Sequence, residues 1–114
     1  MKQGLAKTKY VRIAPRKARL AAGLIRGKKV VEAMTQLTFC NLRGGKLLKK
    51  TLMSAVANAE TQQGATRDNL VVSEVRVDEG PTMKRAKSGC RGRRFPIMKR
   101  TSHFTVIVAS KEQK

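Results

Sequence analysis

The apolar residues of this chain change their spacing several times, and each spacing predicts a different element. Residues 5–13 (LAKTKYVRI) alternate loosely between apolar and polar, which indicates a first strand. Pro15 then suits the first position of a helix, where a missing N–H does no harm, and Gly27 can end that helix. Between them an apolar stripe recurs at helical spacing: Ala18, Leu20, Ala21, Leu24 and Ile25.

Two further helices are predicted. Asn41 can cap a long helix that runs to about Gln63, with Gly64 after it. Its many alanines would let neighbouring elements approach closely. One of its faces is apolar (Leu48, Leu52, Ala55, Val56, Ala59) and another is basic (Arg43, Lys46, Lys50). A shorter helix precedes it, with apolar positions at Val30, Val31, Met34 and Leu37.

Beyond residue 69 the apolar spacing changes to two, which predicts strands. Val71, Val75 and Val77 share one face of a strand, and a final strand does the same with Phe104, Val106 and Val108. Two strands joined by one excursion most simply pair antiparallel. The order of elements predicts an α+β fold, with a small three-stranded antiparallel sheet packed with three helices, plus a long protruding β-hairpin. We expect residues 1–114 to form one domain, with residues 78–102 as the extended basic hairpin.

The excursion itself, residues 83–100 (MKRAKSGCRGRRFPIMKR), carries eight lysines and arginines and no carboxylate. Loops beyond about 12–15 residues are uncommon unless they are functional or disordered. Two arms of about ten residues, meeting near residues 88–92, would project roughly 30 Å at ~3.3 Å per residue. Gly89 and Gly92 would supply the positive φ of the reversal. Apolar residues among the charges suggest a ribbon with a contacting side: Met83, Phe95, Ile97 and Met98.

Charge indicates what the excursion contacts. The net charge is +19, and it is unevenly placed: residues 2–29 hold ten basic side chains and no acidic one, whereas residues 30–83 are balanced. Self-repulsion of this size calls for a polyanion, and nucleic acid is the leading candidate. Cations also crowd the positive end of the first helix dipole, where a phosphate would relieve the conflict and meet free N–H groups.

Catalytic and metal chemistry find little support in the residues. Cys40 and Cys90 lie outside any C-x-x-C or cysteine–histidine cluster, so we expect no zinc or other metal, no cofactor, and two thiols in a reducing compartment. Asp78 and Glu79 are adjacent carboxylates, but neighbours on a strand point to opposite faces. We therefore do not expect them to act as a catalytic acid–base pair. His103 has no triad-like partners and is expected to form hydrogen bonds or to contact RNA. We therefore expect no enzyme.

Four segments resemble one known family closely: LIRGKKV (24–30), ANAE (57–60), DEGPTMKRA (78–86) and KRTSHFTV (99–106). In order and spacing they are similar to the large-subunit ribosomal protein L twenty-two family. The resemblance implies a structural constituent of the large ribosomal subunit that binds large-subunit ribosomal RNA and assists its folding and assembly. It also implies a hairpin that threads the RNA and lines the nascent-peptide exit tunnel.

The resemblance and the two basic regions together define the predicted site. The predicted RNA-binding residues are Arg12, Arg16, Lys17, Arg19, Arg26, Lys28, Lys29, Lys84, Arg85, Lys87, Arg91, Arg93, Arg94, Lys99, Arg100 and His103. The predicted tunnel-lining tip consists of Ser88, Gly89, Cys90, Arg91 and Gly92. Implied partners are ribosomal RNA, neighbouring large-subunit proteins and the nascent peptide, with the protein a monomer within a cytoplasmic ribosome.

Two other classes of protein compete with this interpretation. A free architectural protein could insert the hairpin into a nucleic-acid groove, but such arms commonly work in dimers and no heptad or exposed apolar seam is evident. A secreted cationic polypeptide that acts on membranes would need a signal segment or a basic amphipathic helix with bulky aromatics. We expect neither here, and no segment of the sequence approaches the roughly 20 apolar residues of a membrane span.

Overall fold

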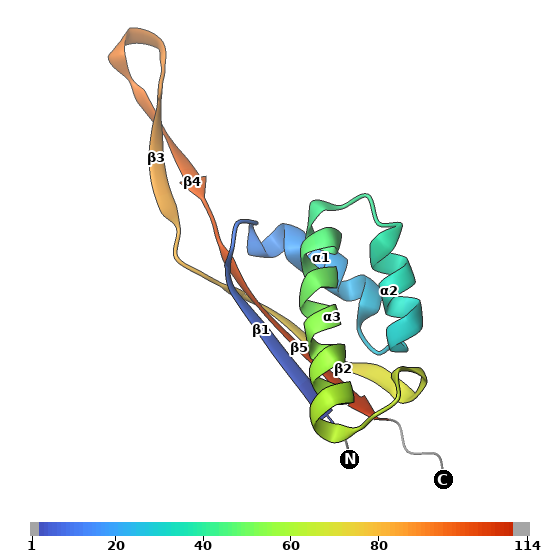
Figure 1. The fold of residues 1–114 in the computed structure, drawn as a ribbon. Coiled ribbons are helices and arrows are strands. Elements are labelled where there is room, and N and C mark those ends of the chain that lie inside the picture. Colours follow the sequence, from blue (N-terminus) through green and yellow to red (C-terminus); the bar gives the residue numbers. More distant parts are fainter. Residues whose placement is uncertain (1–2, 111–114) are drawn as a thin grey trace.

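The structure, a computed structural model, describes residues 3–110. Its elements follow the predicted order (Figure 1): β1 (Gln3–Val11), α1 (Pro15–Ile25), α2 (Val30–Thr38), α3 (Arg43–Gln63), β2 (Leu70–Glu79), β3 (Met83–Ser88), β4 (Arg94–Lys99) and β5 (Ser102–Ser110). An antiparallel sheet has the strand order β1-β5-β2, and β3 pairs with β4 in a separate two-stranded ribbon. The predicted α+β fold class is confirmed.

The central strand β5 supplies the middle of the hydrophobic core. Phe104, Val106 and Val108 are fully buried, as their alternation predicted. The helices cover one face of the sheet (Figure 1), with α3 against β1 and β5 and α1 against β2. At Gly4, an added Cβ would overlap the Ala55 carbonyl oxygen and the Ala59 Cβ. The alanines of α3 therefore do allow the close approach expected of them.

The buried stripe of α1 differs from the prediction. Leu20 is 62% exposed and Leu24 is 37% exposed, whereas Ala18, Ala21 and Ala22 are fully buried. The reason is the short distance between α1 and α3: a Cβ at Gly44 would lie 3.2 Å from the Ala18 Cα. Only small side chains fit between helices that lie this close, so the larger leucines face outward.

Three other boundaries or faces also needed correction. In α2, Val31 is 49% exposed and Ala33 is buried in its place. Asn41 does not cap α3: Leu42 is the N-cap, and its N–H donates to the Cys40 Sγ in a turn that precedes the helix. The first strand ends at Val11 because the chain turns there toward α1. The C-terminal prediction for α3 is confirmed, since Gly64 has φ 65° and caps the helix.

In β2 a register shift between Val72 and Glu74 changes which side chains face the core. Val75 and Val77 are buried as predicted, but upstream of the irregularity Val72 is buried and Val71 is only half-buried. An extra residue in a strand moves every preceding side chain to the opposite face. The period of two could not reveal this shift.

The hairpin extends far from the body (Figure 1). The molecule measures 68 × 24 × 18 Å, and its radius of gyration is 17.2 Å, against about 13 Å for a compact chain of this length. At the neck, the Gly80 N–H donates to the Thr101 carbonyl oxygen at 2.9 Å, and the Thr101 hydroxyl donates to the Pro81 carbonyl oxygen at 2.6 Å. These bonds join the ribbon to the sheet, and the long arm is as expected.

The tip turns differently from the prediction. Gly92 has φ 74°, as expected, but the second positive φ belongs to Arg91, at 58°. Gly89 is extended, with φ −119°. It is a glycine for another reason, because a Cβ there would overlap the ring of Phe95.

Candidate nucleic-acid interface

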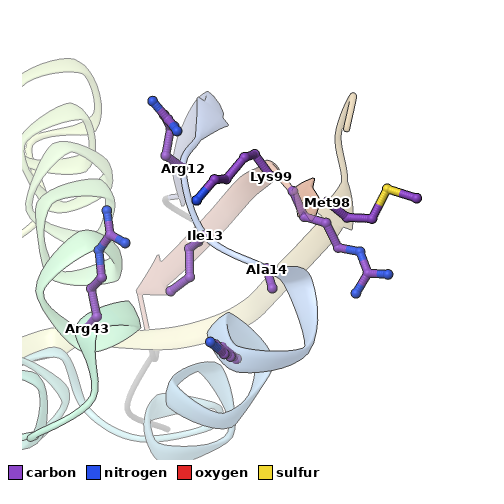
Figure 2. A pocket seen from close by; sticks show the side chains of 8 residues that line it. Arg12, Ile13, Ala14, Arg43, Met98 and Lys99 are labelled. Atoms are coloured by element: carbon purple, nitrogen blue, oxygen red, sulfur yellow. The ribbon is translucent and has the colours of Figure 1, made fainter. Parts of the chain in front are cut away.

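A cationic cleft lies where the hairpin joins the body (Figure 2). Its volume is about 460 Å³, and it is lined by Arg12, Ile13, Ala14, Lys17, Arg43, Met98, Lys99 and Arg100. These residues come from the β1–α1 turn, the first turns of α1 and α3, and the end of the hairpin. Figure 2 shows Arg12, Arg43 and Lys99 on different sides of Ile13. Five of the eight lining residues are cations and none is a carboxylate, so the cleft favours an anion.

Two helix N-termini meet at this cleft. Neither α1 nor α3 has a side-chain cap or an acidic residue in its first turn. The N-cap residues Ala14 and Leu42 offer no side-chain acceptor to the first N–H groups, and Lys17 and Arg43 place positive charge at the positive ends of both helix dipoles. This arrangement is unfavourable in the free protein and becomes favourable when a phosphate occupies the cleft.

Arg43 was not among the predicted site residues. It is the first residue of α3, and the sequence placed it only on a basic face of that helix. The signal was available in principle: a long helix that starts with a cation and has no acidic residue in its first turn. What sequence could not show is that this helix starts beside α1.

The hairpin carries a second group of exposed cations. Cα pairing places Arg85 opposite Ile97 and Lys87 opposite Phe95, and opposed residues of an antiparallel pair share a face. One face of the ribbon therefore pairs basic with apolar residues, and it carries Met83, Ile97 and Phe95 of the predicted contacting side, whereas Met98 lies on the other face, opposite Lys84. All eight hairpin cations are exposed: Lys84, Arg85, Lys87, Arg91, Arg93, Arg94, Lys99 and Arg100.

The described ion pairs lie elsewhere. They are Arg67–Glu60 and Arg76–Glu74, both on the body. A hydrogen bond from Arg76 lowers the pKa of the Glu74 carboxyl. Within residues 3–110 no carboxylate pairs with a hairpin cation, so the charge of the ribbon is available to an external anion.

Arg19 and Arg26 have partners within the protein. The Arg19 guanidinium donates to the Val77 carbonyl oxygen at 3.1 and 3.2 Å, and Arg26 donates to the Val75 carbonyl oxygen at 2.8 Å. Both carbonyls lie on β2, which is an edge strand. These two predicted RNA-binding residues therefore have a role in the fold that does not require RNA.

The remaining predicted cations of the body do not line the cleft. Arg16 is exposed on the first turn of α1, and Lys28 and Lys29 connect α1 to α2. An 11-residue helix spans roughly 16 Å, so the two lysines belong to the opposite end of α1. Backbone bonds hold their segment to β2: the Val72 N–H donates to the Lys28 carbonyl oxygen at 2.9 Å.

His103 is half-buried at the start of β5 and forms a hydrogen bond, one of the two roles expected of it. Its Nδ1 accepts the backbone N–H of Tyr10 at 3.1 Å, and the two rings meet edge-on with centroids 5.0 Å apart. Sequence reasoning did not single out Tyr10. The available signal was a lone tyrosine between the cations of a basic strand.

The tip residues lie together at the far end of the ribbon. Ser88 ends β3, and Gly89 leads into the short 3₁₀ turn formed by Cys90, Arg91 and Gly92. Cys90 is an exposed free thiol and Cys40 a half-buried one. Among the described residues, no group of His, Cys, Asp or Glu side chains could hold a metal ion. No helix between residues 3 and 110 has the length and apolar character needed to cross a membrane.

Fold and site together define a small basic α+β protein with a strongly cationic surface. Comparison with known proteins identifies the family to which it belongs. The family model described as Ribosomal protein L22p/L17e matches residues 6–109, and the chain belongs to this family. The family is one of structural ribosomal proteins and not of enzymes.

The chain has similar relatives in several bacteria. Large ribosomal subunit protein uL22 of Protochlamydia amoebophila is 68% identical over 110 residues, which cover 96% of this chain and 99% of the relative. The proteins of the same name from Chlamydia pneumoniae and Chlamydia muridarum are 59% and 57% identical, each covering 95% of this chain and 97% of its own length. The resemblance found in four short motifs thus extends over nearly the whole sequence.

Proposed function

We propose that this chain is a structural constituent of the large ribosomal subunit in the cytoplasm, and that it binds large-subunit ribosomal RNA through the cleft and the hairpin. The observation that carries the proposal is a protruding ribbon with eight exposed cations beside a cleft that two of these cations line together with three from the body. The relatives that this chain matches over 99% and 97% of their own length are named as large ribosomal subunit proteins, which supports the same assignment.

The cleft and the hairpin would bind different segments of the RNA. The cleft would hold phosphates of one RNA segment against the body, and the ribbon would pass between other segments with its mixed basic and apolar face against them. A chain that joins RNA segments in this way stabilises their folded arrangement, so it would assist assembly of the subunit. Neighbouring large-subunit proteins would complete its surroundings, with the chain present as a monomer.

The ribbon also gives the tip a separate role. The long axis of 68 Å places residues 88–92 far from the sheet, so the tip can reach a part of the subunit that the body does not touch. We place it in the wall of the nascent-peptide exit tunnel, in contact with the passing chain. The exposed Arg91 and Cys90 would then face the tunnel or the RNA beside it.

Sedimentation of cell extract tests the assignment. The endogenous protein should sediment with the large ribosomal subunit, and moderate salt should not remove it. A protein that sediments free of ribosomes, or with nucleoid DNA as a dimer, would instead favour an architectural nucleic-acid-binding protein.

A further inference from the structure

Tyr10 occupies an irregular position in β1. Thr8 pairs with Phe104 and Val11 with Ser102, so β1 has one residue more than β5 in this interval, and Lys9 and Tyr10 together oppose His103. Tyr10 has φ 60°, in the left-handed region that favours glycine and that bulky residues rarely adopt. Bulges of this kind redirect a side chain, and they are frequent beside functional sites.

His103 holds Tyr10 in this conformation. Its Nδ1 accepts the Tyr10 N–H at 3.1 Å, and the rings are perpendicular with centroids 5.0 Å apart. His103 is itself enclosed, because a Cβ at Gly80 would lie 3.1 Å from its Cε1. The tyrosine is thus fixed from one side, yet it remains 64% exposed. A fixed and exposed aromatic ring contributes little to the core.

The surroundings of Tyr10 are basic. Lys9 precedes it and Arg12 follows two residues later, and both are exposed. Arg12 also lines the cationic cleft, together with Lys99 and Arg100 at the base of the hairpin. Because Arg12 lines the cleft two residues from Tyr10, we expect a nucleic acid whose phosphates occupy this cleft to bring its bases near the tyrosine ring.

We propose that Tyr10 is a stacking platform for an unpaired nucleobase, held beside the phosphate-binding cleft by the bulge in β1. This inference rests on the proposed function, since it requires RNA at the cleft. Stacking tolerates any base, because every base has a π-face. The bulge presents the ring, His103 fixes it, and the flanking cations position the backbone of the RNA.

The composition of the chain makes the test specific. Tyr10 is the sole tyrosine and the chain has no tryptophan, so tyrosine emission reports on this ring alone. The full-length protein is titrated at low salt with octaadenylate and with an abasic ribose-phosphate octamer of the same charge. Octaadenylate should quench the emission and the abasic octamer should not. Equal quenching by the two probes, or none by either, would overturn the proposal.

Three variants separate stacking from a structural role. Tyr10→Leu should weaken octaadenylate binding roughly 10-fold and leave abasic binding unchanged, whereas Tyr10→Phe should keep both. Tyr10→Gly suits the positive φ, so it should keep the thermal midpoint near that of the parent while it loses octaadenylate affinity as the leucine variant does. Lower stability with unchanged octaadenylate affinity would make Tyr10 purely structural.

The experiment distinguishes failure of the stacking inference from failure of the proposed RNA-binding function. If both probes bind and Tyr10→Leu weakens them equally, or not at all, the stacking inference is wrong and the phosphate-binding surface stands. If neither probe binds the parent protein at low salt, the proposed RNA-binding function is wrong, and the stacking inference is wrong with it.

Discussion

The guanidinium of Arg19 on α1 donates two hydrogen bonds to the carbonyl oxygen of Val77 on β2, at 3.1 and 3.2 Å. β2 is an edge strand, and an exposed edge offers unpaired backbone groups to other chains. Arg26 binds the next outward carbonyl, that of Val75, and Gly27 donates its N–H to the Val72 carbonyl oxygen. Helix α1 and the segment after it therefore cover this edge with basic residues that sequence alone assigns to RNA.

Replacing Arg19 should consequently affect stability more than RNA binding. Arg19→Ala removes both bonds, so we expect the free energy of unfolding to fall by about 1.5–2 kcal/mol, the lower part of the range for charged donors, because the contact is only part-buried. Denaturant unfolding measures this. Arg16→Ala is the matched control, since Arg16 is exposed on the same helix, and it should change stability by less than about 0.5 kcal/mol. If the two substitutions lowered the free energy of unfolding equally, Arg19 would have no special role in covering the edge of the sheet.

Substitutions in the cleft should affect RNA binding more than stability, the reverse of the effect expected for Arg19. Lys17→Ala and Arg43→Ala each remove a cation from a helix N-terminus at the cleft, so each should weaken RNA binding and reduce the salt slope by about 1, with little change in stability. Because both cations face one space, the double variant should show less than the sum of the two effects. Lys50→Ala, on an exposed position of α3 outside the cleft, is the control. If Lys50→Ala lowered RNA affinity as much as Arg43→Ala does, binding would depend only on the total charge of the protein and not on the cleft.

Salt dependence measures how much of the binding is electrostatic. If about eight cations meet phosphates, the logarithm of the association constant should fall with the logarithm of salt concentration with a slope of magnitude about 6–7. Filter binding or fluorescence anisotropy across a salt series, with a large-subunit RNA fragment, gives this slope. A slope near zero would contradict the polyanion interpretation.

The body should fold without the ribbon. Met83 and Lys99 are paired in register, so residues 84–98 can be replaced by an Asn-Gly turn, which closes a two-residue hairpin. The removed residues contribute nothing to the buried core, and we expect thermal unfolding to stay cooperative and near its original midpoint. The shortened protein should still bind RNA through the cleft but enter subunits abnormally. Loss of cooperative unfolding would show that the arm supports the body.

The sequence correctly predicted elements in which one whole face is buried and packing places no further restriction on side-chain size. In β5 one face is buried against helices, so alternation identified Phe104, Val106 and Val108. The same reasoning failed for Leu20, because hydrophobicity reports what a side chain prefers and not whether neighbouring helices leave room for it. It failed for Val71 because one irregularity in β2 reverses the alternation.

The site was predictable in its charge and not in its geometry. The hairpin cations are visible as a run, but the cleft joins Arg12, Arg43 and Lys99, which are far apart in sequence and meet only in the fold. Arg19 and Val77 show the converse, since a cation that charge assigns to RNA is engaged by a backbone carbonyl. Tyr10 lacks any periodic signal, because its position depends on a bulge.

Backbone amide exchange, measured on the free protein and on the large subunit, tests whether RNA orders the hairpin. Residues 84–100 carry eight cations and no carboxylate, and a two-stranded ribbon alone is marginally stable in water. We expect fast exchange across this segment in the free protein. Inside the subunit we expect strong protection of both arms and of the first turn of α1, with weaker protection at residues 88–92. Equal protection of the arms in both states would show that the ribbon is ordered without RNA, and RNA-dependent ordering of the hairpin would be wrong.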